Sequence, residues 1–366
     1  MGEKRKLRRV FPGSNSARGF FSFFTEIAGP AANRVLVLKG GPGCGKSTFM
    51  RKIGATLQEN GYDLEYHHCA SDSQSLDGLL VPALGVALID GTSPHVFDAP
   101  SPGVIGETID LGRFVDRPAL RENKERIFEL QSEVGRLFKQ AHRMLAITGV
   151  FRESLENCYS MEDVLDRGAR DRFTLELLEE ILGGKMKEKE GTVRRLFASA
   201  ITPQGWVHHL DTLLEPQTKV YLFEGASSTE KSRIIERILA ASIWRGFHVE
   251  AYHCALNPEK IDHLIIPELG TAIVNNFTPH RLVSPLVCRK IDSGEFIAAL
   301  PPEKQLERDR LLSRFNQVLE EAIGFLARAR SVYQELEGHY ISRMDFAAAD
   351  QLCRETTARL LEETHT

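Results

Sequence analysis

The stretch that decides the fold runs Val35-Leu36-Val37-Leu38-Lys39-Gly40-Gly41-Pro42-Gly43-Cys44-Gly45-Lys46-Ser47-Thr48. Its first four residues are apolar and include two β-branched valines, which is typical of a buried strand. The residues after them follow the spacing Gly-x-x-x-x-Gly-Lys-Ser, and a helical pattern comes next. A strand, a glycine-rich loop and a helix in this order predict a phosphate-binding loop, the Walker A motif.

The residue types in this loop suit a triphosphate such as ATP. Glycines at 40, 43 and 45 let backbone N–H groups turn inward around the phosphates, because no Cβ is in the way. The start of the following helix adds a positive dipole end. We expect Lys46 to reach the β- and γ-phosphates and the Ser47 hydroxyl to ligate Mg²⁺. The predicted binding residues are Gly40, Gly41, Pro42, Gly43, Cys44, Gly45, Lys46, Ser47 and Thr48.

The composition is that of a globular protein long enough for two or more domains, with 366 residues, 42% hydrophobic and 26% charged. A net charge of −4 gives no general attraction to nucleic acid. No apolar run approaches the roughly 18 residues that a membrane span needs. The six cysteines lack the spacing of a disulfide framework, and the basic start of the chain is a poor signal peptide. We therefore expect a cytoplasmic protein without a nucleic-acid or membrane partner.

The chain repeats itself at an offset of 185 residues, which is the difference between Gly225 and Gly40. The same offset joins His68 and Cys69 to the pair at 253 and 254, and a worn copy of the loop spans Gly225 to Ser232. Similarity at a fixed spacing indicates internal duplication. The predicted fold class is α/β, with tandem duplicated P-loop NTPase units.

Each unit, residues 1–190 and 191–366, is expected to hold a parallel sheet flanked by helices, because strands and helices alternate along it. Two long helical patterns close each unit, with apolar residues at steps of three and four. We expect these helices to pair as hairpins inside their own unit, although an intermolecular coiled coil would use the same seam. The sheets are expected over residues 8–118 and 194–300, and the hairpins over 119–182 and 303–364.

Two carboxylates of the first unit are candidates for catalysis. Asp90 follows the apolar run that ends at Ile89, and an Asp at the end of an inner strand of a P-loop protein holds Mg²⁺. The alternative is a turn formed by Asp90 and Gly91. Asp72 follows the strand before it, where loops line the ligand crevice, and could orient a nucleophile or cap a loop.

The second unit lacks these groups. Asn257 stands at the position of Asp72, and Asn275 at the position of Asp90. Glu230 stands at the position of Gly45, where a carboxylate would repel phosphate. The sequence therefore predicts one working nucleotide site in the first unit and a degenerate copy in the second, although Lys231 remains there.

Other polar residues leave two interpretations open. His95 and His280 could sense a γ-phosphate or make a structural hydrogen bond. The repeated pair His68-Cys69 suits packing better than metal binding, because adjacent strand residues point to opposite faces. Three arginines could neutralise phosphate charge or lie solvated at the surface: Arg113, Arg117 and Arg121.

The glycine-rich loop and the segment from Ser71 to Gly78 resemble a little-studied bacterial family of tandem P-loop ATPases, usually described as ATP-binding or nucleotide-kinase-like. The resemblance covers most of the chain. It implies ATP binding and a P-loop NTPase fold, and it implies no substrate.

Three functions follow from these features. The first is a Mg²⁺-dependent ATPase in which ATP switches the arrangement of the two units. The second is a kinase that transfers phosphate to a small molecule or nucleotide, and the third is a non-catalytic ATP sensor or scaffold. Gly91 after Asp90 replaces the water-activating glutamate of many motor ATPases, which favours the kinase- and GTPase-like side of the fold. No Asn-Lys-x-Asp guanine reader is present, so adenine is favoured.

Overall fold

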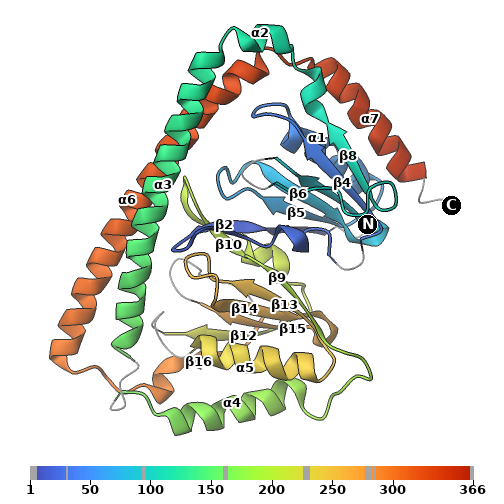
Figure 1. The fold of residues 1–366 in the computed structure, drawn as a ribbon. Helices are drawn as coiled ribbons and strands as arrows, with labels where there is room; N and C mark the ends of the chain where they lie inside the picture. Colours follow the sequence, from blue (N-terminus) through green and yellow to red (C-terminus); the bar gives the residue numbers. More distant parts are fainter. Residues whose placement is uncertain are drawn as a thin grey trace.

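The computed structural model describes residues 6–29, 32–92, 96–159, 164–225, 231–276, 282 and 286–362. Its two halves follow the same order of elements (Figure 1). The first half contains β1 (Leu7–Val10), β2 (Gly13–Ser16), β3 (Gly19–Ser22), β4 (Arg34–Lys39), α1 (Lys46–Glu59), β5 (Leu64–His68), β6 (Leu76–Val81), β7 (Val86–Asp90), β8 (Gly106–Asp110), α2 (Arg117–Arg121), α3 (Lys124–Asn157) and α4 (Arg167–Leu182). The second half contains β9 (Thr192–Leu196), β10 (Ser199–Thr202), β11 (Gly205–His208), β12 (Lys219–Glu224), α5 (Lys231–Trp244), β13 (His248–His253), β14 (Ile261–Ile266), β15 (Thr271–Asn275), β16 (Val287–Asp292), α6 (Pro302–Ile341) and α7 (Phe346–Glu362).

Each half is built on a six-stranded sheet, and the two sheets are alike. The first has the order β1-β5-β6-β7-β4-β8, and the second has the order β9-β13-β14-β15-β12-β16. β6 and β14 run antiparallel to both of their neighbours, so the prediction of a parallel sheet is wrong for one strand in each half. β6 contains Asp77 and Gly78, which are turn formers that disfavour a strand, so the local sequence gives little sign of this strand. The matching sheets suggest a tandem duplication.

β4 lies between β7 and β8, and its side chains alternate between two cores. Leu36 and Leu38 pack in the core that contains the apolar side of α1. Val35 and Val37 belong to a second core on the opposite face of the sheet. Burial on both faces explains the continuous apolar run, and it places the glycine-rich loop at the carboxyl edge of the sheet.

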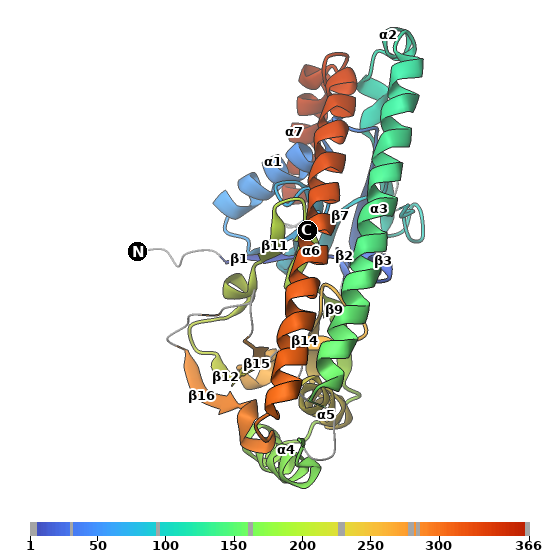
Figure 2. The same ribbon diagram turned by 90° about the vertical axis from the view of Figure 1, so that its left-hand side faces the viewer.

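The two longest helices come from different halves and pack along each other. α3 and α6 form one long side of the molecule (Figures 1 and 2). They are antiparallel, because Leu130 near the start of α3 meets Leu336 near the end of α6, while Leu145 meets Leu326. Among the described residues no helix combines the length and apolar character that crossing a bilayer requires.

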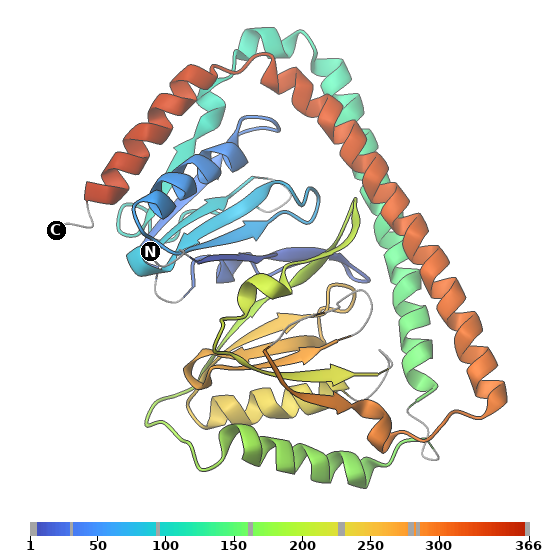
Figure 3. The ribbon, with the colours of Figure 1, turned by 180° about the vertical axis from the view of Figure 1, so that it is seen from behind.

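The hairpins predicted over residues 119–182 and 303–364 are wrong, because their second helices cross to the opposite half. α4 packs on α5, where Leu177 is fully buried in the core of the second sheet. α7 packs on α1, where Leu360 joins the core of the first sheet (Figure 3). Apolar spacing predicts which face of a helix is buried, but it does not identify the partner.

Two short hairpins, β2–β3 and β10–β11, join the halves at the centre of the molecule (Figure 1). Phe11 and Phe197 exchange backbone hydrogen bonds of 2.9 and 3.0 Å, and both side chains are fully buried. The side-chain amide of Asn15 donates to the backbone carbonyl of Ile201 at 2.8 Å. Paired backbone and a shared apolar core therefore fix the two halves against each other.

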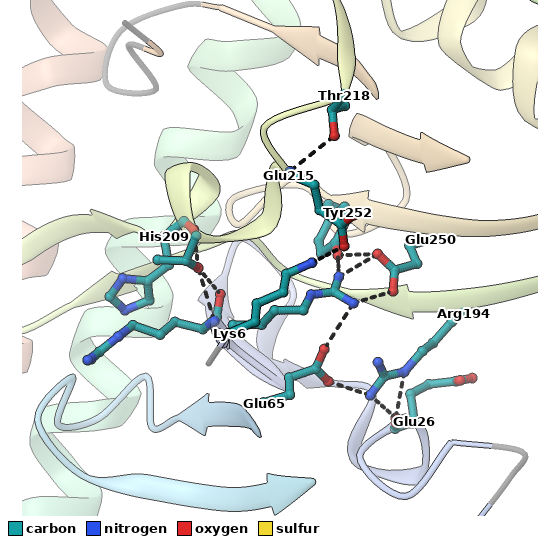
Figure 4. Close-up of polar contacts among 12 residues, drawn as sticks. Lys6, Glu26, Glu65, Arg194, His209, Glu215, Thr218, Glu250 and Tyr252 are labelled. Carbon is teal, nitrogen blue, oxygen red and sulfur yellow. Dashed lines mark hydrogen bonds and ion pairs between the residues drawn. The ribbon is translucent and has the colours of Figure 1, made fainter. Parts of the chain in front are cut away.

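A buried ionic cluster joins the same halves reciprocally (Figure 4). Arg8 of the first half pairs with Glu250 of the second at 2.5 Å and donates to the Tyr252 hydroxyl at 2.8 Å. Arg194 of the second half pairs with Glu65 of the first at 2.7 Å. Burial opposes ionisation of both carboxyls, but the facing arginines outweigh it and hold the pKa of Glu65 and of Glu250 below its ordinary value.

Candidate functional site

The loop between β4 and α1 presents backbone amides at the start of a helix. Gly43 and Gly45 have φ of 71° and 84°, in the left-handed region that favours glycine. Within the part of the chain that the structure describes, no hydrogen-bond acceptor is assigned to the amides of Gly43, Gly45, Lys46 or Ser47. Amides of this kind at a helix N-terminus attract anions.

Lys46 is held beside the same loop. Its Nζ donates to the carbonyls of Gly40 at 2.8 Å and Gly41 at 3.0 Å, and it lies 3.7 Å from Oδ2 of Asp90. The Ser47 hydroxyl accepts a hydrogen bond from the amide of Leu76 at 2.9 Å. The structure therefore brings the predicted lysine and the predicted strand-end carboxylate together.

Asp90 ends β7 and serves its own turn as well. Its Oδ1 accepts hydrogen bonds from the amide of Thr92 at 2.9 Å and from the Thr92 hydroxyl at 2.5 Å. This contact matches the turn-forming alternative. Oδ2 is the oxygen on the side of Lys46, so one carboxylate stabilises the turn and faces the loop.

Asp77 is a buried carboxyl at this site that the sequence patterns above do not single out. Gly78 pairs with Ile89 across the β6–β7 ladder, which puts Asp77 beside Asp90. Burial, followed by the charge of Asp90, raises the pKa of Asp77 to about 8. A largely protonated Asp77 at neutral pH adds little negative charge near the loop. The recurrence of this residue as Asp262 was the available signal.

Asp72 lies on the loop after β5 and pairs with an arginine of the opposite half. Arg330 of α6 reaches Asp72 Oδ2 at 2.7 Å and Glu337 Oε2 at 2.7 Å. Asp72 also accepts hydrogen bonds within its own loop, from the amide of Gln74 at 3.1 Å and the hydroxyl of Ser75 at 2.9 Å. Both proposed roles of Asp72, loop support and site residue, are compatible with this position.

The C-terminal part of α6 lies over the glycine-rich loop. A Cβ built on Gly41 would lie 2.5 Å from the Tyr340 ring, and one on Gly43 would lie 2.9 Å from the Glu337 carbonyl oxygen. Arg330, Glu337 and Tyr340 are seven and three residues apart, which places them on one helix face. That spacing was readable, but only the fold shows that the face covers this loop.

The three arginines weighed from the sequence lie in the segment that follows β8. The Arg113 guanidinium stacks over the neighbouring Phe114 ring, with 4.7 Å to the ring centroid. Arg117 and Arg121 are the first and last residues of α2. The structure places Arg330 rather than these residues beside Asp72.

The second half differs from the first at the corresponding positions. Lys231 is 1% exposed, donates to the Gly225 carbonyl at 3.1 Å, and has its pKa lowered to about 8, mainly by burial. Asn275 is also buried, and its backbone N–H donates to Nδ1 of His263 at 3.3 Å. Residues 226–230, with Glu230, lie outside the described residues, as do His95 and His280.

The repeated histidines take part in packing. His68 Nδ1 lies 2.8 Å from the Ser73 carbonyl oxygen, and the ring lies against His209 and Phe11. His253 repeats this contact with Pro258 at 2.6 Å. These contacts agree with the packing interpretation. Among the described residues no group of three or more His, Cys, Asp or Glu side chains is arranged to hold a metal ion.

Comparison with known proteins gives one partial match. A family model described as Nephrocystin 3, N-terminal, matches residues 22–81. The matched part runs from the end of β3 through β4, the glycine-rich loop, α1 and β5 to the end of β6. The match covers only part of the first half. It does not show that the chain belongs to the bacterial tandem P-loop family that the motifs resemble. No curated protein and no solved structure matches significantly.

Proposed function

We propose that this chain binds ATP at residues 40–48 and is a Mg²⁺-dependent ATPase in which nucleotide binding switches the arrangement of the two halves. On this proposal the halves are duplicated P-loop units of a cytoplasmic protein, and the second unit is degenerate. The resemblance to tandem P-loop ATPases and the motif spacing support the assignment.

The observation that carries the proposal is the contact of α6 with the glycine-rich loop. α6 starts in the second half, and its Tyr340 and Glu337 lie directly on Gly41 and Gly43. Phosphates entering this loop would need the space beside the glycines. α6 would then shift relative to the first half, and it would carry the shift to the second half because it follows β16 of the second sheet.

The residues at the site fit a nucleotide with its metal. The amides of Gly43, Gly45 and Ser47 would bind phosphate oxygens, and Lys46 would add a positive charge beside them. Ser47 and Asp90 would hold Mg²⁺, whose charge offsets that of the phosphates. Asp77 keeps a proton at neutral pH and so limits repulsion of the anion.

A labelled-ATP assay tests the reaction. Purified protein is incubated with γ-labelled ATP, Mg²⁺ and a metabolite extract, with Asp90→Asn as the variant. Free phosphate that requires Asp90 supports the ATPase. A labelled small molecule would instead support the kinase, and binding without turnover would support the sensor. Unchanged turnover in Asp90→Asn would remove this carboxylate from the site.

A further inference from the structure

We propose that Arg330 is the residue by which the second half distinguishes ATP from ADP at the loop of the first half, by exchanging Asp72 for the terminal phosphate. This inference rests on the proposed function, because it requires a nucleotide at residues 40–48. Arg330 belongs to α6, whose first residue follows the second sheet. The side chain is therefore supplied to the site by the opposite half.

The position of Asp72 relates Arg330 to the end of the site where the γ-phosphate is expected. The loop that begins at Asp72 leads into Leu76, whose amide donates to the hydroxyl of Ser47 at 2.9 Å. Lys46 and Ser47 of this motif serve the β- and γ-phosphates and their metal. An arginine bound to this loop is thus close to the expected place of the γ-phosphate, which ATP has and ADP lacks.

The ion pair is suited to exchange rather than to permanent support. Asp72 keeps the amide of Gln74 and the hydroxyl of Ser75 as donors when Arg330 leaves. The planar guanidinium of Arg330 carries several N–H donors. Phosphate oxygens accept hydrogen bonds from a guanidinium as carboxylate oxygens do. The Arg330 side chain is 18% exposed, so its contact with Asp72 is largely but not completely buried from solvent.

A second contact shows that the opposite half grips this same loop. The Ser73 hydroxyl donates to the side-chain oxygen of Gln204, which lies between β10 and β11, at 3.1 Å. Arg330 and Gln204 therefore reach adjacent residues of one loop from two separate elements of the second half. Movement of Arg330 toward phosphate would break its contact with Asp72 and leave the contact between Gln204 and Ser73. The loop would then have two defined arrangements.

An arginine near the corresponding lysine of the second half supplies a control. Arg152 of α3 contributes charge near Lys231, and it pairs with Glu156 four residues later at 3.2 Å. Asn257 stands where the first half has Asp72. Arg152 thus has the same residue type and a similar place on a long helix, but it faces the copy predicted to bind no nucleotide.

Dissociation constants for ATP and ADP, measured by calorimetry with Mg²⁺, test the exchange. We expect Arg330→Gln to weaken ATP binding by about tenfold or more, the usual effect of one charge-assisted hydrogen bond, and to change ADP binding by less than about threefold. Asp72→Asn removes the competing anion and should tighten ATP relative to ADP. Arg152→Gln should change neither constant, and Arg330→Lys should retain part of the preference for ATP.

Equal changes for ATP and ADP in Arg330→Gln, or weaker ATP binding in Asp72→Asn, would overturn the exchange while leaving ATP binding at Lys46 intact. Loss of ATP discrimination in Arg152→Gln would also overturn it. If the wild-type protein binds neither nucleotide, both the exchange and the proposed function fail. Arg330→Lys and Asp72→Asn keep the test valid should Arg330→Gln not fold.

Discussion

Replacing Arg8 with methionine tests the ionic cluster that joins the halves. Arg8→Met keeps a long apolar side chain but removes the cation that faces Glu250 at 2.5 Å, and Glu250 is 6% exposed. Breaking a buried pair by deleting one partner costs about 3–5 kcal/mol, because a charge is left buried. The Arg8 side chain is 19% exposed, so we expect the lower end, about 3 kcal/mol of unfolding free energy.

The loss of unfolding free energy in Arg8→Met should depend on pH. In the wild type, Arg8 holds the pKa of Glu250 below its ordinary value, so the stabilisation is present above the unfolded pKa and is lost as pH falls through the folded pKa. Without Arg8, burial raises that pKa, and the folded state binds the extra proton first. The deficit of Arg8→Met should therefore shrink as pH falls from 8 to 5.

Urea denaturation followed by circular dichroism measures both effects. The control is Arg18→Gln, since Arg18 and Glu259 also join the halves at 2.7 Å but are 59% and 60% exposed. An exposed pair contributes about 0–1 kcal/mol, so this variant should hardly change stability. Equal losses in the two variants, or a deficit in Arg8→Met that grows toward pH 5, would show that the buried Arg8–Glu250 pair does not stabilise the fold as proposed.

Two further predictions concern single residues of the first half. Asp77→Asn should gain stability relative to the wild type as pH rises from about 5 to 8, because the unfolded carboxyl is then ionised while the folded one, with a pKa of about 8, still holds its proton; denaturation midpoints across this range check it, and a constant difference contradicts it. Leu360→Ala should cost about 2–5 kcal/mol and speed hydrogen exchange in α1, because α7 completes the core of the opposite half; faster exchange confined to α5 would contradict the helix exchange.

Local patterns predict the elements of this chain well, and pairings less well. The run from Val35 to Leu38 forms β4 because both faces of that strand are buried. β6 escapes sequence reading because Asp77 and Gly78 disfavour a strand locally, and contact with both neighbours overrides that preference. Register and neighbours settle such a segment, and neither is encoded in its own periodicity.

The exchange of α4 and α7 lies beyond sequence patterns for a different reason. A helix face that carries Leu177 or Leu360 can pack on any apolar surface of matching shape, so the two similar halves offer two equivalent partners. The position of Arg330 depends on the same long-range choice. The closeness of Lys46 and Asp90 was predictable, because β4 and β7 are parallel neighbours, Asp90 ends β7 and Lys46 follows the loop after β4.

The most direct test of the account is the stoichiometry of ATP binding to Lys46→Ala and Lys231→Ala, measured by calorimetry with Mg²⁺. Lys46 lies beside amides with no assigned acceptor, whereas Lys231 is buried against Gly225. We predict one ATP per wild-type chain, one for Lys231→Ala and none for Lys46→Ala. ATP binding that survives in Lys46→Ala and is lost in Lys231→Ala would contradict it.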